Sequence, residues 1–433
     1  MFAHTVSIPE QDSTTDWPAL WRALPASAAV FSLCCPEAGP HAGGEPYISK
    51  TTNLRRRVQR LLSPDSKSSK RLNLAGRMGS IAYTETGSDL ETALLLYRAT
   101  RQSFGDRARK RLHLRPSAVL RMAWENAYPR VYVTHRISVR AMDSTYGPFP
   151  SRNAAERFLE DSLNLFLLRR CTEDLHPDPA FPGCVYSEMK MCLAPCFQGC
   201  TDQRYAVEAE VVRAYFATRG ASLLAQLENE RNAASAALDF ESAAQRHARM
   251  LKVKAVVQQA APLVHPLSQL DAVILQPASH SAVENDGHVA IILIRAGVFS
   301  GPALYSAQGM IHPNEQSGSS SLFAHPTALA PTPLSSEVAS PKATRSLLED
   351  RLRDVLESLQ AQAVSSRASS DILADYLALL ARWYYRPAAK RGGEIFFRDE
   401  SGNFPVPKIL RGISRVVRGA KNPEDTESSS TLA

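Results

Sequence analysis

The sequence predicts an α+β protein of several domains, and three observations support this. The chain has 433 residues, more than one ordinary hydrophobic core accommodates. Short apolar runs of strand type alternate with helical patterns around residues 26–115 and again after residue 261. Between them, residues 203–257 have a nearly uninterrupted helical pattern. The predicted units are a flexible N-terminus (1–25), a small α/β domain (26–115), linker helices with a cysteine cluster (116–202), a helical region (203–260), an α/β region (261–420) and a disordered tail (421–433).

The first α/β unit opens with a strand, a loop, a second strand and a helix. Ala28–Leu33 is an apolar run of strand type, and residues 36–46 form a loop rich in Pro and Gly. Tyr47 begins a second short strand, and a helix is expected to start near Asn53. Apolar side chains at helical spacing predict another helix over Asp89–Gln102.

Patterns in the middle of the chain predict a strand, a turn and a helix. Val131–Val133 has the pattern of a strand, and Gly and Pro mark a turn just after Tyr146. Ala154–Arg170 has apolar residues at helical spacing and predicts an amphipathic helix. A cysteine-rich segment follows this helix.

Positive charge is concentrated in two places. The net charge is +7 and the isoelectric point is near 9.0, which matters for phosphate binding only where the charges are clustered. One cluster lies in the helix after Tyr47 and the other follows the helix over residues 89–102. Two solvated helix faces would explain them, and so would contact with nucleic acid. The candidate nucleic-acid contacts are Arg55, Arg56, Arg60, Arg109, Lys110 and Arg111.

Four of the seven cysteines fall within one short stretch: Cys171, Cys184, Cys192 and Cys196. No apolar run approaches the roughly 18 residues that span a bilayer, and no signal peptide is recognisable at the N-terminus. We therefore expect a cytoplasmic protein with no membrane partner, in which thiols stay reduced and bind a metal. Thiolates prefer zinc or iron, and the spacing does not choose between zinc and an iron–sulfur cluster. Cys200 is a possible substitute ligand.

From about Ala28 to Lys254 the chain resembles the UvrC family of excinucleases. The motifs that carry the resemblance occur in the family's order: YGPFPS at Tyr146–Ser151, LFLLRRC at Leu165–Cys171, and Cys184 followed by LAPC at Leu193–Cys196. UvrC proteins supply the nuclease of bacterial nucleotide excision repair. The resemblance implies DNA binding by the two basic clusters and an iron–sulfur cluster at the four cysteines.

The resemblance also implies that residues 26–115 form a GIY-YIG nuclease domain, but with a degraded site. Tyr47, Lys50 and Arg57 match family positions, and Arg57 aligns with the arginine that contacts the scissile phosphate. Phe31 lacks the hydroxyl of the first motif's tyrosine, and Tyr97 stands where the family has the glutamate that anchors the metal. A tyrosine cannot ligate Mg²⁺ as a carboxylate does, so Mg²⁺ is expected only if the nuclease is active.

The helical region contains a second family motif. An ordinary helical hairpin would explain the pattern over residues 203–257. The resemblance instead identifies a UVR hairpin, which pairs with a related hairpin on UvrB, and small alanines would allow a partner helix to approach closely. The expected partner contacts are Phe240, Glu241, Ala243, Ala244 and Arg246.

The last α/β region resembles, more faintly, the start of the UvrC carboxy-terminal half. Strands are expected at Asp271–Leu275 and Val289–Arg295, and helices at Leu347–Leu359 and Asp371–Tyr385. Residues 314–344 are rich in Ser, Thr, Pro and Ala and predict a disordered insertion. We expect a partial RNase H-like region, because the chain ends before the family's second nuclease site and its helix-hairpin-helix repeats.

Three functions are consistent with these patterns. The first is a UvrC-like DNA-binding protein of nucleotide excision repair, accessory in role, with weakened or lost incision. The second is an excision endonuclease that makes one metal-dependent nick through a modified GIY-YIG site. The third is a UVR-domain adaptor outside repair, which would show little salt-sensitive affinity for DNA.

Overall fold

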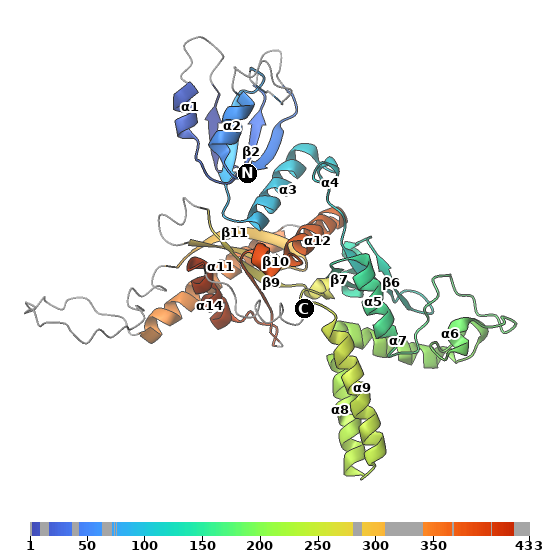
Figure 1. The fold of residues 1–433 in the computed structure, drawn as a ribbon. Helices are drawn as coiled ribbons and strands as arrows, with labels where there is room; N and C mark the ends of the chain where they lie inside the picture. The colour runs from blue at the N-terminus through green and yellow to red at the C-terminus, as the bar shows by residue number, and fades with distance from the viewer. Residues whose placement is uncertain are drawn as a thin grey trace, which may run out of the picture.

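The computed structural model describes residues 2–8, 17–36, 43–62, 72, 74, 76–279, 288–307, 341–365, 368–399 and 401–419. Within them the chain forms three antiparallel sheets covered by helices, with a long helical hairpin standing away from the rest (Figure 1). The mixture of helices and antiparallel sheets expected from the sequence is confirmed, and it is compatible with several domains. The predicted tail and most of the predicted insertion at 314–344 lie outside the described residues.

The N-terminal sheet has the strand order β1-β4-β2-β3. Helix α2 packs its buried Leu54, Val58 and Leu61 against Phe31 on one face of this sheet. Strand β1 pairs with β4 and helix α1 packs on the same core, so part of the segment expected to be flexible is ordered. The elements are β1 (His4–Ser7), α1 (Trp17–Ala23), β2 (Ala29–Cys34), β3 (Tyr47–Thr51), α2 (Leu54–Leu62) and β4 (Ser80–Glu85).

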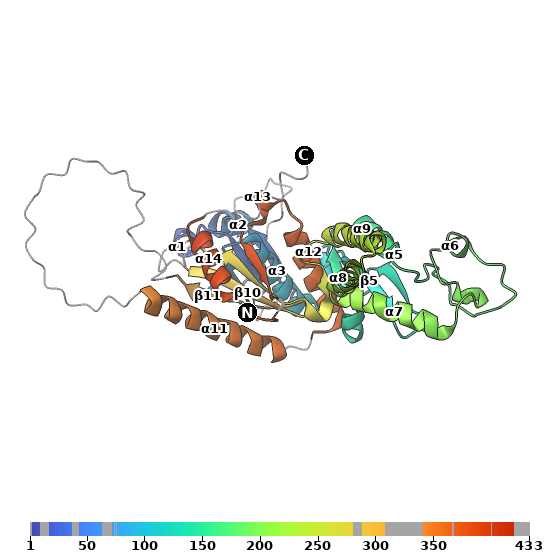
Figure 2. The ribbon, with the colours of Figure 1, turned by 90° about the horizontal axis from the view of Figure 1, so that it is seen from below.

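The central sheet has the order β11-β10-β9-β12 and is covered by helices on both faces. Strand side chains alternate between the two faces, so Val273 lies in the core with α11 and α14 while Ile274 lies in the core with α12. Figure 2 shows α11 lying along one side of this sheet. The elements are β9 (Ala272–Pro277), β10 (His288–Arg295), β11 (Val298–Ser306), α11 (Pro341–Ser365), α12 (Ser370–Tyr384), α13 (Ala388–Arg391), β12 (Glu394–Phe397) and α14 (Val406–Val417).

Helix α3 (Asp89–Phe104) joins the N-terminal and central sheets. It falls inside the predicted domain at 26–115, yet its buried Leu90, Leu94 and Tyr97 pack in the same core as α12 and the central sheet. Gly87 precedes it, and a Cβ there would lie 2.1 Å from the carbonyl group of Ala278 at the end of β9. Only glycine permits this approach. Helix α4 (Arg107–Arg111) follows α3.

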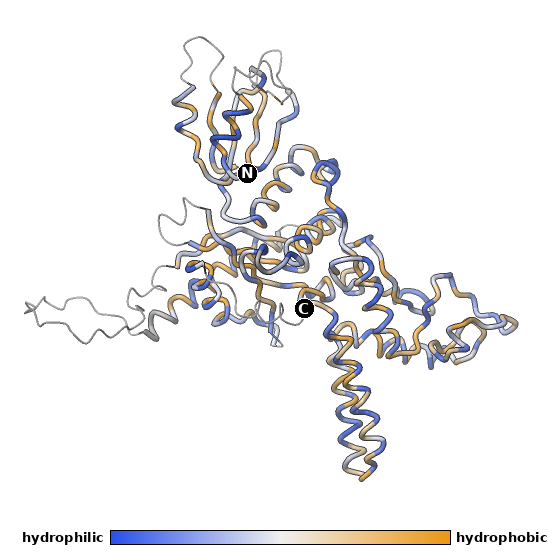
Figure 3. The backbone as a smooth tube through the Cα atoms, viewed as in Figure 1, coloured by the Kyte–Doolittle hydropathy of each residue, from blue (hydrophilic) through white to orange (hydrophobic). Residues whose placement is uncertain are grey.

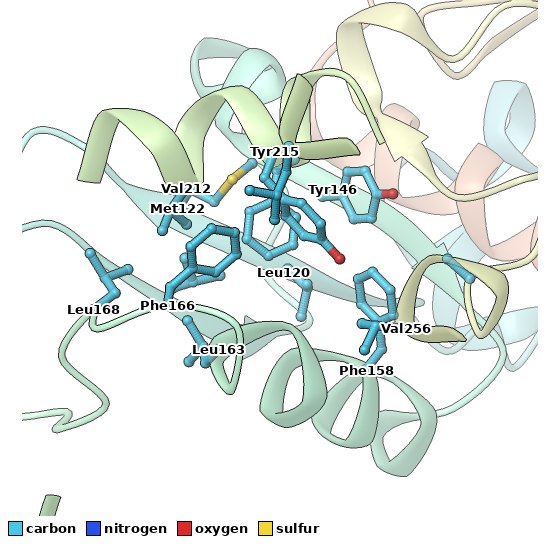
Figure 4. Close-up of a cluster of buried hydrophobic side chains, with 14 of the residues drawn as sticks. Leu120, Met122, Tyr146, Phe158, Leu163, Phe166, Leu168, Val212, Tyr215 and Val256 are labelled. Atoms are coloured by element: carbon cyan, nitrogen blue, oxygen red, sulfur yellow. The ribbon is translucent and has the colours of Figure 1, made fainter. Parts of the chain in front are cut away.

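The middle sheet has the order β6-β5-β7-β8 and packs against α5, α7 and the base of the hairpin. Figure 4 shows the aromatic centre of this core, in which the Tyr146 ring stacks on Phe158 with a centroid distance of 6.0 Å. The elements are β5 (Ala118–Ala123), β6 (Arg130–Thr134), η1 (Val139–Ser144), β7 (Thr145–Phe149), α5 (Arg152–Leu163), α6 (Val185–Glu188), η2 (Pro195–Phe197), α7 (Asp202–Ala217), β8 (His265–Pro266) and η3 (Leu267–Gln269).

The helix predicted over Ala154–Arg170 is shorter than expected, because α5 ends at Leu163. The backbone after it is held by tertiary partners instead. The N–H of Leu167 donates to Oε1 of Glu208 at 2.8 Å, and the Leu167 carbonyl accepts from Leu193 at 3.0 Å. This exit from the helix brings Arg169 and Cys171 into contact at the start of the cysteine-rich segment.

Helices α8 (Ala221–Ala236) and α9 (Phe240–Gln258) form an antiparallel hairpin. Its base packs in the middle core through Leu223, Leu227 and Met250, and its tip extends away from the body (Figure 1). Along the tube in Figure 3 hydrophobic and hydrophilic residues alternate over the hairpin, as expected for two helices that bury only their shared face.

Candidate functional site

Tyr47 and Arg57 of the predicted GIY-YIG site meet on the N-terminal sheet. Arg57 extends from α2 and donates a hydrogen bond from Nη2 to the Tyr47 hydroxyl at 3.0 Å. Both residues are partly exposed, and the Tyr47 ring lies 6.1 Å from the Phe31 ring. Phe31 itself is fully buried, so this first degraded position contributes packing in place of a hydroxyl.

Lys50 is separated from this pair by the pleat of the strand. Residues three apart on a regular strand point to opposite faces, and the pairing of β2 with β3 is regular. Tyr47 pairs opposite Leu33 in the core that α2 covers, whereas Lys50 pairs opposite Val30 and is exposed. The structure therefore groups two of the three predicted residues.

Tyr97, which the resemblance matches to the family's metal-binding glutamate, packs in the core between α3 and α12, and Tyr47 packs in the core of the N-terminal sheet. It is 1% exposed, and its hydroxyl donates to Oδ2 of Asp375 on α12 at 3.0 Å. Burial, followed by the adjacent Asp375 carboxylate, raises the pKa of Tyr97 far above its ordinary value. The side chain is thus a neutral hydrogen-bond donor in the core between α3 and α12.

Two other carboxylates of this region, Glu91 and Glu45, have hydrogen-bond or ion-pair partners within the protein. Glu91 is buried and accepts the backbone N–H of Gly87 at 2.8 Å, and desolvation raises the pKa of its carboxyl group. Glu45 pairs with Arg107 at 3.1 Å and with Arg111. In the part of the chain that the structure describes, no group of three or more His, Cys, Asp or Glu side chains is arranged to hold a metal ion.

Of the six predicted nucleic-acid contacts, three side chains form hydrogen bonds or ion pairs within the protein, and the other three are exposed. Arg56, Arg60 and Lys110 are exposed. Arg55 donates to the carbonyl of Leu24 at 2.8 Å, which holds it against the protein. The remaining two arginines are held by carboxylates.

Arg109 is held mainly by Asp375, whose side chain is 2% exposed. Nε of Arg109 lies 2.5 Å from Oδ1 of Asp375, and Nη2 lies 3.3 Å from Asp371. Arg111 contacts Glu45 and lies over the Phe104 ring, 3.7 Å from its centroid. Sequence reasoning missed Asp375, although a lone carboxylate on the apolar stripe of a predicted helix is a usable signal for a buried ion pair.

The four clustered cysteines are neighbours in the structure. All are partly exposed, and Ala194 donates its N–H to the sulfur of Cys192 at 3.3 Å. Burial raises the pKa of the Cys192 thiol to about 11, with smaller contributions from Cys171, Cys196 and Cys184. The donor set is one of soft thiols, and the buried Nε atoms of Arg130 and Arg170 beside it have no hydrogen-bond partner. In this conformation the four thiols are not drawn together into a metal-holding group, but soft thiol donors are the ligand type that zinc and iron–sulfur clusters take.

The tip of the hairpin exposes large apolar side chains. Leu238 is 73% exposed and Phe240 is 66% exposed, although apolar residues of this size are usually buried. Asp239 caps α9 by accepting the N–H of Ser242 at 3.1 Å, and Arg246 pairs with Glu230 across the hairpin at 3.0 Å. Among the predicted partner contacts, Glu241 is exposed, and Ala243 and Ala244 are at least partly accessible.

No helix within the described residues combines the length and the apolar character that crossing a membrane requires.

The family-model match and the similar curated proteins both point to UvrC proteins. The family of the UvrC/Cho excinuclease middle domain matches residues 118–215, which hold strands β5, β6 and β7 of the middle sheet, α5, the four clustered cysteines and most of α7. UvrABC system protein C of Alcanivorax borkumensis is 27% identical over 227 residues, 50% of this chain and 35% of that protein. The corresponding protein of Edwardsiella ictaluri is 27% identical over 248 residues, 57% of this chain and 38% of that protein.

A third relative, UvrABC system protein C of Haemophilus ducreyi, is 25% identical over 269 residues, 60% of this chain and 41% of that protein. The chain therefore spans about two fifths or less of the length of these curated relatives. No solved structure matches it. The ordered run of motifs, the match of the middle domain and these relatives agree: residues 118–215 belong to the UvrC/Cho excinuclease middle-domain family, and half or more of the chain is similar to UvrC proteins.

Proposed function

We propose that this protein acts in bacterial nucleotide excision repair as a UvrC-like DNA-binding accessory protein that has lost incision. The observation that carries the proposal is the burial of Tyr97 against Asp375, because the resemblance matches Tyr97 to the metal-binding glutamate of the family. A metal that stabilises the leaving oxygen is central to this class of phosphodiester cleavage. The relatives' name, UvrABC system protein C, supports the link to that system.

DNA would be bound by phosphate contacts on the N-terminal domain. Arg56 and Arg60 are exposed on α2, and the hydrogen-bonded pair of Arg57 and Tyr47 lies on the same helix and the adjacent strand. Guanidinium groups on a helix suit phosphate contacts because each offers several donors in one plane. Lys110 would extend the positive surface on α4.

A UvrB-type protein would bind at the hairpin tip. Leu238 and Phe240 present apolar surface there, and the exposed Glu241 lies beside it. This arrangement resembles the helix-to-helix mode of recognition, in which a few apolar anchors carry most of the affinity. We also propose that the four cysteines hold an iron–sulfur cluster or zinc, and that the protein is cytoplasmic.

One experiment tests the central proposal. Purified protein and its Arg57→Ala variant are incubated with a lesion-bearing duplex and Mg²⁺ or Mn²⁺, with and without a UvrB-type partner, and both nicking and DNA affinity are measured. Arg152→Ala is the matched control, because Arg152 pairs with Glu156 on the exposed face of α5. We expect no nick, and DNA binding that Arg57→Ala weakens while Arg152→Ala leaves it unchanged.

The Tyr47–Arg57 pair favours a second candidate, a single metal-dependent nick through a modified site. A nick that Arg57→Ala abolishes would establish that function and overturn the first. Absence of salt-sensitive DNA binding, with retained binding of a partner at the hairpin, would instead favour an adaptor outside repair.

A further inference from the structure

Three arginines surround the four-cysteine cluster, and Arg169 contacts it most directly. Arg169 is 2% exposed, and its Nη1 lies 3.6 Å from the sulfur of Cys171, within the range of an N–H···S hydrogen bond. Its Nε donates to the carbonyl of Tyr128 at 3.0 Å, and Nη1 also donates to the carbonyl of Glu173 at 2.9 Å. These bonds fix the guanidinium plane against the sulfur.

Arg130 and Arg170 complete the positive shell. Arg130 donates to the carbonyls of Cys171 and Thr172. Arg170 donates from Nη2 to Oδ1 of Asn164 at 2.9 Å and lies over the Tyr186 ring, 5.9 Å from its centroid. Buried Nε atoms of both residues have no hydrogen-bond partner. Across the described residues, Arg169 forms hydrogen bonds to carbonyl oxygens and to the Cys171 sulfur but no ion pair, whereas Arg170 also interacts electrostatically with the Glu160 carboxylate.

An unpaired guanidinium group at such a site requires a physical reason. Burying a charge without a counter-ion is unfavourable, so proteins pair such groups. Carbonyl oxygens supply only partial negative charge. Four thiolates around a divalent metal or a cluster leave a net negative charge on the sulfurs, which would supply the counter-charge that the buried Arg169 lacks.

We infer that Arg169 is a positioning residue of the cysteine site, which directs an N–H to the Cys171 sulfur and compensates the negative charge of the metal-bound thiolates. Hydrogen bonds from outside the ligand set orient the ligands and strengthen their hold on the metal. This inference rests on the proposal that the four cysteines bind a metal.

Titration with Co²⁺ tests the inference without relying on any enzymatic activity. The full chain, reduced and kept anaerobic, is titrated with Co²⁺, and the sulfur-to-cobalt charge-transfer band reports thiolate ligation. We expect Arg169→Gln to weaken Co²⁺ binding about 10- to 100-fold and to shift the charge-transfer band, because the N–H···S bond is lost. Arg169→Lys keeps the charge without the planar fork, and its affinity is expected between those of the two other forms.

Arg213→Gln is the matched control, because Arg213 lies over Trp124 at the same core and pairs with Glu210. Circular dichroism of each variant reports folding, and if Arg169→Gln does not fold, Arg169→Lys decides by the same criteria. Failure of the unmodified protein to bind Co²⁺ through thiolates would overturn the metal proposal and this inference together. Unchanged affinity and an unchanged band in the Arg169 variant would overturn the role of Arg169 alone.

Discussion

The hydroxyl of Tyr97 donates a hydrogen bond to the carboxylate of Asp375, which stands 278 positions later in the chain. Asp375 also accepts from Arg109 at 2.5 Å and lies 3.9 Å from Arg101. A helix of the N-terminal half and a helix of the C-terminal half are thus joined through one buried carboxylate. Arg98 adds to this joint by donating to the carbonyl of Phe299 on β11 at 3.1 Å.

Removing the carboxylate should destabilise the protein strongly. Asp375→Ala leaves the Tyr97 hydroxyl and Arg109 without their acceptor, and we expect a loss of about 2–3 kcal/mol in the free energy of unfolding. Arg109 retains 31% side-chain exposure and can re-solvate, which keeps the loss below that of a fully buried pair. Tyr97→Phe removes one donor only and should cost about 1 kcal/mol. Denaturant unfolding measures both.

Tyr186→Phe serves as the control for these variants, because Tyr186 is 37% exposed near the cysteines and distant in sequence from the joint. If Asp375→Ala unfolded at the same denaturant concentration as the unmodified protein, Asp375 would not join the two halves.

Substituting exposed arginines should weaken DNA binding, whereas substituting an arginine that is already paired with a carboxylate should lower stability instead. Arg56→Gln and Arg60→Gln together should lower DNA affinity and reduce the slope of its salt dependence by about one to two phosphate contacts, with little change in stability. Arg109→Gln should lower stability and leave the salt slope unchanged, because Arg109 is already paired. Fluorescence anisotropy over a range of salt concentrations makes the comparison, and a lower salt slope in the Arg109 variant would contradict it.

Substitutions at the tip and at the base of the hairpin should have different effects: those at the tip on partner binding, and those at the base on protein stability. Phe240→Ala should weaken association with a UvrB-type partner by about 2 kcal/mol, the size expected for a buried apolar anchor, and leave the thermal midpoint nearly unchanged. Leu227→Ala, at 1% exposure in the middle core, should instead cost about 2–4 kcal/mol in stability. Calorimetric titration with the partner, alongside thermal unfolding, distinguishes the two effects. Equal partner affinity in Phe240→Ala would exclude the tip as the binding surface.

His265 should make stability depend on pH below neutrality. Burial and the adjacent Arg219, whose Nη1 lies 3.1 Å from Nε2, lower the pKa of His265 to about 4. The unfolded chain therefore binds a proton near pH 6.5 that the folded protein does not bind until about pH 4. The stabilising contribution is complete above pH 6.5 and is lost as the pH falls, by up to about 1.4 kcal/mol per pH unit.

Thermal unfolding at several pH values from about 7.5 down to about 4.5 checks this prediction. His265→Gln should show a shallower decline than the unmodified protein, and His247→Gln, changed at an exposed position on α9, should decline as the unmodified protein does. Parallel curves for all three forms would assign the acid sensitivity to other groups.

Local patterns predicted most of the elements. The strands at Ala29–Cys34, Tyr47–Thr51, Ala272–Pro277 and His288–Arg295 are confirmed, as are helices α3 and α12, because each has a clear apolar period. Strand β1 was missed, since its exposed residues depend on pairing with β4 for their conformation. The early end of α5 was missed for a similar reason: distant partners hold the backbone beyond it.

The candidate site was less predictable from sequence. The meeting of Tyr47 with Arg57 follows from a strand that precedes a helix packed on its sheet, and this contact is local. The separation of Lys50 follows from strand alternation. The position of Tyr97 beneath α12 depends on a contact between distant segments, and nothing in the neighbouring residues indicates it. The predicted roles in DNA, metal and partner binding remain predictions.

The length of the hairpin sets how far its tip lies from the middle core. Helix α8 continues for nine residues beyond Leu227, its last residue in the middle core, which at about 1.5 Å per residue gives a reach of about 14 Å from that core to the tip. That length equals roughly four base-pair steps of duplex DNA at about 3.4 Å each. Because α2 and the hairpin tip lie at opposite ends of the molecule in Figure 1, a protein held at one and a duplex held at the other would not compete for space. The molecule would therefore hold the two proposed binding surfaces apart.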